Sequence, residues 1–115
     1  MITNAIEFVS FTLKRGASVS DFLLASKEMN IKFLSAQKGY ISRKLLVDGE
    51  TWADLVLWET MDDAQNAAKI CNDDSVAAEY FSFIENVNFH DFAIEQSYEL
   101  EEFAEILLKR KNPSK

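Results

Sequence analysis

Two side chains in strand-like segments are candidates for catalysing proton transfer, His90 and Asp54. His90 is the only histidine of the chain, and histidine is the side chain that changes charge near neutral pH. On a strand it shares a face with Phe92, so it could be a general base for a phenol or a 1,3-dicarbonyl compound, or a structural histidine bonded to a nearby acceptor. Asp54 lies among aromatic and aliphatic neighbours, where a carboxyl group either holds a proton or needs a partner. Arg43 or Lys44 could be that partner across a hairpin.

Four side chains are candidates for holding a ligand. Arg43 could anchor an anionic or enolate group if a cavity lies beside it. Trp58 and Tyr40 could form the walls of a flat aromatic pocket, and plain core packing is the alternative for such rings. Glu7 shares a strand face with apolar residues, so it marks either the cavity or an exposed strand start.

Composition and charge exclude several classes of protein. The 115 residues are 48% hydrophobic and 27% charged, which is typical of one globular domain. The net charge is −7, and Lys69 is the only basic residue in the stretch 48–95, so we expect no nucleic-acid partner. No apolar run is long enough to span a bilayer, so we expect no membrane partner. No secretion signal is visible and the single cysteine makes no internal disulfide, so we expect a cytoplasmic protein. One histidine and one cysteine do not make a zinc site, and no glycine-rich nucleotide motif occurs, so we expect no metal and no cofactor.

Hydrophobic patterning predicts strands and helices in a fixed order. Apolar and β-branched runs predict strands, and capping boxes at Ser18 and Thr60 predict two helix starts. Gly39 stands where a left-handed helix cap is expected, and Asp48-Gly49 predicts a hairpin turn that places Arg43 opposite Asp54. The predicted strands span residues 5–13, 40–47, 51–59 and 87–96. The helices follow Ser18 and Thr60, with a second helical segment around 76–84, a last amphipathic helix over 98–111 and a tail at 112–115 that we expect to be disordered.

This β-α-β-β-α-β order predicts an α+β fold of the ferredoxin-like, split βαβ type, with a four-stranded antiparallel sheet. The fold occupies one domain, residues 1–97, and the C-terminal helix is extra to it. In the third strand Trp58 and Val56 project to one face and Leu55 and Leu57 to the other, so both faces are apolar. Because helices cover only one face, we expect a homodimer in which two sheets pack face to face.

The middle of the chain resembles a known family. The run Gln37–Arg43, the Asp48-Gly49 hairpin, the strand Thr51–Glu59 and the helix start at Asp63-Ala64 resemble the antibiotic biosynthesis monooxygenase-like domains of the dimeric α/β-barrel superfamily. The resemblance covers residues 4–96. It implies a homodimeric α/β barrel with a ligand cavity between each sheet and its own helices. Members include cofactor-independent monooxygenases of phenolic polycycles and haem-degrading enzymes.

Carried over position by position, the resemblance selects among these activities. Trp58 matches the tryptophan that both kinds of enzyme carry late in the third strand, and Asp54 stands where the monooxygenases have an asparagine. Ala67 and Ala68 occupy the place of the haem-ligating histidine, so haem degradation is disfavoured. The helical arginine of the monooxygenases has no counterpart, because Lys69 is the only basic residue in that half of the chain.

Two functions follow as alternatives. One is a cofactor-independent monooxygenase, or a related small enzyme, that acts on an aromatic or polyketide-like molecule. His90 or Asp54 would be its base, Arg43 would stabilise an anion, and Trp58 would form a wall of a dry cavity. The other is a non-catalytic dimeric domain that binds a small ligand. A cavity beside Trp58 with His90 or Asp54 opening into it would favour the enzyme.

Overall fold

The computed structural model describes residues 3–98 of the chain. Its elements follow the predicted order, with one short 3-10 turn added after the first helix. Apart from Tyr98, the helix predicted over residues 98–111 and the tail after it lie outside the described residues. The elements are β1 (Ala5–Leu13), α1 (Val19–Lys32), the turn η1 (Leu34–Ala36), β2 (Tyr40–Asp48), β3 (Thr51–Trp58), α2 (Met61–Cys71), α3 (Ser75–Phe81) and β4 (Ile84–Ala93).

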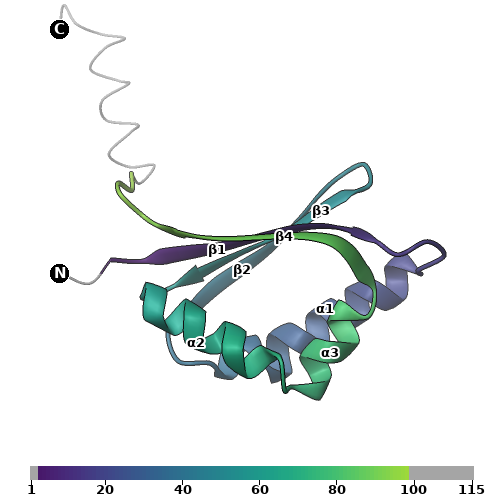
Figure 1. The fold of residues 1–115 in the computed structure, drawn as a ribbon, viewed down its shortest axis with the longest axis horizontal. Helices are drawn as coiled ribbons and strands as arrows, with labels where there is room; N and C mark the ends of the chain where they lie inside the picture. Colours follow the sequence, from purple (N-terminus) through teal and green to yellow (C-terminus); the bar gives the residue numbers. More distant parts are fainter. Residues whose placement is uncertain (1–2, 99–115) are drawn as a thin grey trace, which may run out of the picture.

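Four antiparallel strands form the sheet in the order β2-β3-β1-β4. This is the ferredoxin-like arrangement that the sequence predicts, with β1 and β3 at the centre. α1, α2 and α3 all lie against one face of the sheet, and no described helix covers the other face (Figure 1). The core therefore lies between the sheet and the helices.

Side-chain caps set where the helices begin. Ser18 and Thr60 each accept a hydrogen bond from the backbone N–H three residues further on, which confirms both predicted helix starts. Asp74 caps α3 in the same way through the N–H of Ala77, at 2.8 Å. Within residues 3–98, no helix is long and apolar enough to cross a membrane.

β4 begins earlier than predicted. The sequence pattern assigns Ile84 to a helical stripe, but α3 ends at Phe81 and Ile84 pairs with Leu13 of β1. A β-bulge follows, where Asn86 has a φ of 55° and donates a hydrogen bond to the Thr12 hydroxyl at 2.9 Å. Asparagine tolerates this left-handed backbone better than most residues. Next to this bulge the start of β4 curves toward α3 (Figure 1).

The hairpin between β2 and β3 turns one residue later than predicted. Its turn residues are Gly49 and Glu50, and only Gly49 has a positive φ, 62°. Arg43 therefore stands opposite Val56, and the prediction that it stands opposite Asp54 is wrong by two positions. Because an even shift keeps side chains on the same face, the Arg43 side chain still reaches Asp54 along the diagonal.

Gly39 does not cap a helix, contrary to the prediction. α1 is followed by η1, and Gly39 comes after both, directly before β2. Its φ is +85°, and a methyl group added to it would lie 2.6 Å from Cβ of Asp63 in α2. Both observations require glycine, because the start of β2 lies tightly against the first turn of α2.

The two faces of the sheet differ in what covers them. On the helix side, the ring of Phe22 from α1 packs 5.2 Å from the Tyr80 ring of α3 and 5.9 Å from the Phe11 ring of β1. The other face carries apolar side chains that no described element covers. They are Ile6 and Phe8 of β1, Leu55 and Leu57 of β3, and Phe92 of β4.

Candidate functional site

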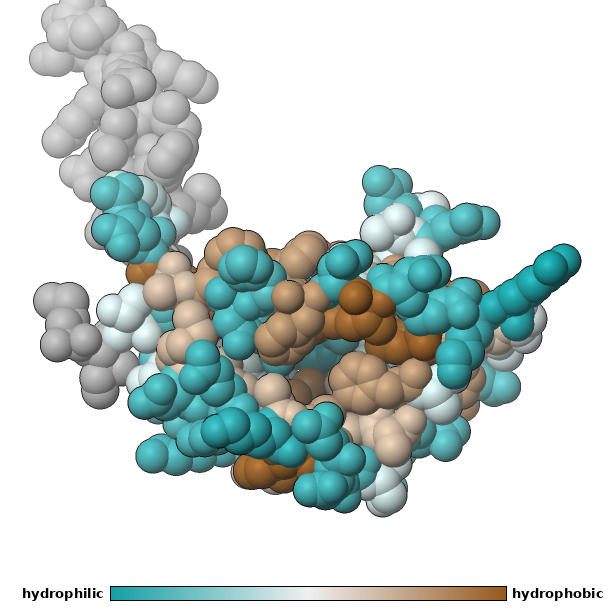
Figure 2. Space-filling model, viewed as in Figure 1, coloured by the Kyte–Doolittle hydropathy of each residue, from teal (hydrophilic) through white to brown (hydrophobic). Residues whose placement is uncertain are grey.

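A cavity of about 520 Å³ lies between the sheet and the helices. Side chains of β1 and β3 form its floor, and residues of the helices and of the bulged part of β4 form its walls. Figure 2 shows the molecule hollowed between the sheet and the helices, with hydrophobic side chains around the hollow. The walls are mostly apolar, with Met29, Phe33, Phe81, Val87 and Phe89 among them. Pockets of this size hold small organic molecules.

Glu7 is an acidic group on the cavity floor. Strand alternation turns it toward the helices. Burial is the main reason why the pKa of Glu7 rises from 4.5 to about 7; the charges of Asp91 and Asp54 add to the rise, and the nearby Trp58 indole partly offsets it. In the described part of the chain no ion pair holds this carboxyl group. Glu7 therefore changes charge near neutral pH, as a general base that works there should.

Trp58 brings a hydrogen-bond donor to the same floor. The residue is fully buried. Its Nε1–H makes no hydrogen bond of normal geometry within residues 3–98, but its weaker interaction with the Glu7 carboxyl group lowers the pKa of that group. The ring of Tyr40 packs edge-on against the indole at 6.0 Å. Because a buried donor without a good acceptor is costly, the indole N–H would gain from a closer oxygen atom, either of the Glu7 carboxyl group or of a bound molecule.

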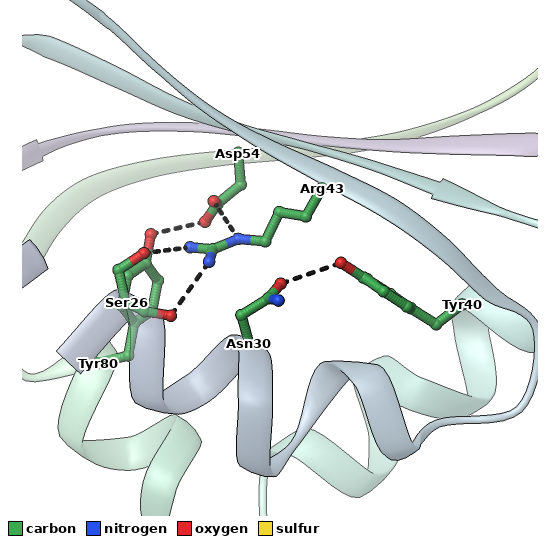
Figure 3. A network of polar contacts seen from close by, with 6 residues as sticks. All are labelled: Ser26, Asn30, Tyr40, Arg43, Asp54 and Tyr80. Carbon is green, nitrogen blue, oxygen red and sulfur yellow. Dashed lines mark hydrogen bonds and ion pairs between the residues drawn. The ribbon is translucent and has the colours of Figure 1, made fainter. Parts of the chain in front are cut away.

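Arg43 and Asp54 form a buried ion pair beside the cavity (Figure 3). Arg43 Nε donates to Asp54 Oδ1 at 2.8 Å, and the two side chains are 6% and 8% exposed. The other guanidinium nitrogens donate to the carbonyl and hydroxyl oxygens of Ser26 in α1, at 3.1 and 2.9 Å. The Tyr80 hydroxyl donates to Asp54 Oδ2 at 2.7 Å. The network ties β2 and β3 to α1 and α3.

Tyr80 belongs to this network, which the sequence pattern does not reveal. The helical spacing places Tyr80 in an apolar stripe, and its ring does lie in the core, 5.2 Å below the Arg43 guanidinium carbon. Burial and the Asp54 carboxylate raise the pKa of Tyr80, so the hydroxyl keeps its proton and remains a donor. Arg43 and Tyr80 hold Asp54 in place, because each donates one hydrogen bond to one of its carboxylate oxygens. The sequence offers one signal for this role: a tyrosine in an apolar helix stripe buries a hydroxyl group, which needs a hydrogen-bond acceptor.

The structure separates the predicted site residues into two groups. Glu7, Arg43, Asp54 and Trp58 line the cavity. His90 does not: it pairs with Phe8, is exposed, and stacks on Phe92 at 4.3 Å on the face away from the helices. Tyr40 is also absent from the lining, because its hydroxyl donates to Asn30 of α1 at 3.0 Å while its ring supports Trp58 (Figure 3).

Cys71 at the end of α2 also lines the cavity. Burial, with the nearby Glu7 and Asp74 charges, raises the pKa of its thiol to about 11, so the thiol is neutral at physiological pH. Among residues 3–98, no three histidine, cysteine or acidic side chains gather as a metal site. The cavity thus offers a carboxyl group, an indole N–H and a neutral thiol to a bound molecule.

Known structures match the fold at low sequence identity. No protein-family model matches the chain, and no curated protein matches it in sequence. SnoaB, a cofactor-independent oxygenase from Streptomyces nogalater, superposes with a TM-score of 0.70 at 14% identity, over 83% of this chain and 96% of that chain. A provisionally assigned antibiotic biosynthesis monooxygenase from Bordetella bronchiseptica gives 0.68 at 17%, over 84% and 99%. The chain has the fold of the antibiotic biosynthesis monooxygenase-like proteins.

This monooxygenase-like fold also occurs in a dimeric ferredoxin-like protein from an uncultured marine organism. That protein superposes with a TM-score of 0.59 at 11% identity, over 84% of this chain and 92% of that chain. The resemblance noted in the sequence is therefore confirmed at the level of the fold. Activity has to be argued from the side chains of the cavity.

Proposed function

We propose that the chain is a cofactor-independent oxygenase that removes a proton from a small, planar, aromatic or polyketide-like molecule. The single observation that carries this proposal is the meeting, on the floor of an apolar cavity, of Glu7 and the Trp58 N–H, which has no well-formed hydrogen bond among residues 3–98. A base and a hydrogen-bond donor side by side are what proton abstraction from a phenol or a 1,3-dicarbonyl compound needs. Glu7 thus takes the role of base for which the sequence pattern suggests His90 or Asp54.

The chemistry divides between the protein and the substrate. The Glu7 carboxylate accepts a proton from an acidic C–H or O–H bond, whose electron pair stays on the substrate. The Trp58 N–H donates to the oxygen on which negative charge develops. The anion then reacts with dioxygen, and oxidation of an activated methylene group to a carbonyl consumes one O₂ and releases one water. No external reductant is needed, and the apolar walls exclude water from the anion.

A second function, non-catalytic binding of a small ligand, rests on the state of Arg43. Among the described residues, Arg43 is the only cationic side chain that lines the cavity, and Asp54 already neutralises it. An enzyme that stabilised a full negative charge would gain from a free cation there. This observation favours non-catalytic ligand binding as the alternative function. Turnover measurements distinguish it from the oxygenase.

Oxygen consumption with 1,8-dihydroxyanthrone tests the proposal, because this planar phenol has a methylene group activated by two aryl rings. We expect Glu7→Gln to lower the rate about 10²–10⁴-fold, because the amide accepts no proton. Trp58→Phe keeps the aromatic wall but loses the donor, and should lower the rate about 10²-fold. Glu79→Gln, an equal charge change on an exposed residue of α3, is the matched control and should leave the rate unchanged. Binding of the anthrone without oxygen uptake by the wild type would establish the alternative.

We also propose that the protein acts as a homodimer in the cytoplasm. The uncovered face of the sheet supports a second copy as the partner, because Leu57, Ile6 and Phe92 lie side by side on it. Light scattering should give about twice the chain mass of 13.1 kDa at micromolar concentration. Leu57→Lys should reduce the measured mass to that of one chain, and a wild-type mass of one chain would contradict the dimer.

A further inference from the structure

Glu7 has a second carboxyl group beside it, that of Asp91. The two residues are register partners on the neighbouring strands β1 and β4, so their side chains project from the same face of the sheet. Asp91 Oδ1 is buried and has no hydrogen-bond partner among the described residues. A carboxylate oxygen left in this state gains from a shared proton, and Glu7 is the neighbouring acid that can share one.

Asp91 also stands between the cavity and the outside. Glu7 lines the cavity, whereas Asp91 does not. β4 is an edge strand, and Asp91 is partly exposed on it. A buried base such as Glu7 must pass on the proton that it takes before the next turnover, and a second carboxyl group at the sheet edge provides that path.

We propose that Glu7 and Asp91 act as one proton-sharing pair, in which Asp91 receives the proton that Glu7 takes from the ligand and releases it at the edge of the sheet. The inference rests on the proposed function for its chemistry. One proton moves at each step and no electron is transferred, because the electron pair of the broken bond stays on the ligand. Asp91 acts through Glu7 without touching the ligand, so it is a positioning residue.

The charges around the pair favour sharing a single proton. Asp54 of β3 adds only the smallest of the contributions that raise the pKa of Glu7, because Arg43 of β2 offsets its charge, and Cys71 of α2 contributes a neutral thiol. Burial raises the pKa of Asp91, and His90 beside it lowers that pKa. Two adjacent carboxyl groups with no neutralising ion pair cannot both ionise easily, so the pair titrates in two coupled steps.

Carbon-13 NMR of the side-chain carboxyl groups of the free protein tests the pair without any substrate. In the wild type we expect the Glu7 signal to titrate near pH 7 and to show a second inflection as Asp91 titrates. Asp91→Asn keeps the shape and removes the charge, so Glu7 should then titrate about one pH unit lower. Glu85→Gln removes one charge at the exposed far end of β4 and is the matched control, with an unchanged Glu7 curve.

Kinetics with 1,8-dihydroxyanthrone test the direction of proton flow. Asp91→Asn should lower kcat about tenfold with little change in KM, and should move the acidic limb of the pH profile below pH 7. Added acetate, a small carrier of protons, should restore part of the rate of this variant. A Glu7 titration curve identical in Asp91→Asn and wild type overturns the pair, even if the enzyme is active. Absence of oxygen uptake by the wild type overturns the proposed function instead, and a coupled titration would then still establish the pair.

Discussion

Glu7→Gln is expected to stabilise the folded protein by about 3 kcal/mol at pH 8, although it removes the proposed base. The pKa of Glu7 is about 7 in the folded protein against 4.5 for an unburied carboxyl group, and each pH unit of difference corresponds to about 1.36 kcal/mol. The folded state therefore binds more protons than the unfolded state between pH 4.5 and pH 7. Stability falls with rising pH across that window and stays low above it.

Urea unfolding at pH 4.5, 6 and 8 measures this effect. At the lowest pH the wild-type carboxyl group is largely neutral in the fold, so Gln and Glu should give similar free energies of unfolding. The two proteins should diverge progressively as the pH rises. Glu79→Gln, exposed on α3, controls for the loss of one negative charge and should follow the wild type. If the free energies of Glu7→Gln and wild type stay parallel from pH 4.5 to pH 8, Glu7 is not a buried acid.

The opposing effects on stability and rate separate a functional acid from an accidental one. A buried carboxyl group without an ion pair destabilises the fold at the pH where it ionises. Leucine or glutamine would fill the same position at lower cost. A position that carries such a penalty inside a cavity is where a stability–activity trade-off is expected.

Most of the fold could be predicted because it depends on local patterns. The Ser18 and Thr60 side chains cap the helices that follow them, which makes the helix starts predictable. Gly49 provides the positive φ that the hairpin turn needs. Long-range pairing explains the early start of β4, which local patterns do not predict. Ile84 suits a helix stripe by spacing, but pairing with Leu13 draws it into β4.

The site was only partly predictable because it depends on which strand face turns inward. Glu7 and Trp58 follow from strand alternation, since each shares a face with apolar core residues. His90 alternates equally well, but the bulge at Asn86 and the pairing with Phe8 turn it away from the cavity. No local pattern predicts a bulge in a strand whose partner is more than 70 residues away in the sequence. The pairing of Glu7 with Asp91 depends on the same register.

Arg43→Met is expected to lower the free energy of unfolding by about 3–5 kcal/mol. The substitution leaves the Asp54 carboxylate buried with only the Tyr80 hydroxyl as a partner, and also removes both hydrogen bonds to Ser26. Chemical denaturation at neutral pH measures the loss. Arg43→Lys should recover only part of it, because an ammonium group cannot reproduce the contacts that the planar guanidinium makes with Asp54 and Ser26.

The triple variant Arg43→Met, Asp54→Leu, Tyr80→Phe tests whether the network has only a structural role or also binds the ligand. It removes the buried charges together with the hydroxyl that would lose its acceptor, so its stability should return to within about 1–2 kcal/mol of the wild type. If the network only joins the strands to the helices, this variant should still bind 1,8-dihydroxyanthrone. A stable triple variant that no longer binds it would mean that the polar groups of the network, Arg43 and Asp54 at the cavity among them, also hold the ligand. A loss below about 1 kcal/mol in Arg43→Met alone would mean that the pair is hydrated and does not hold the fold together.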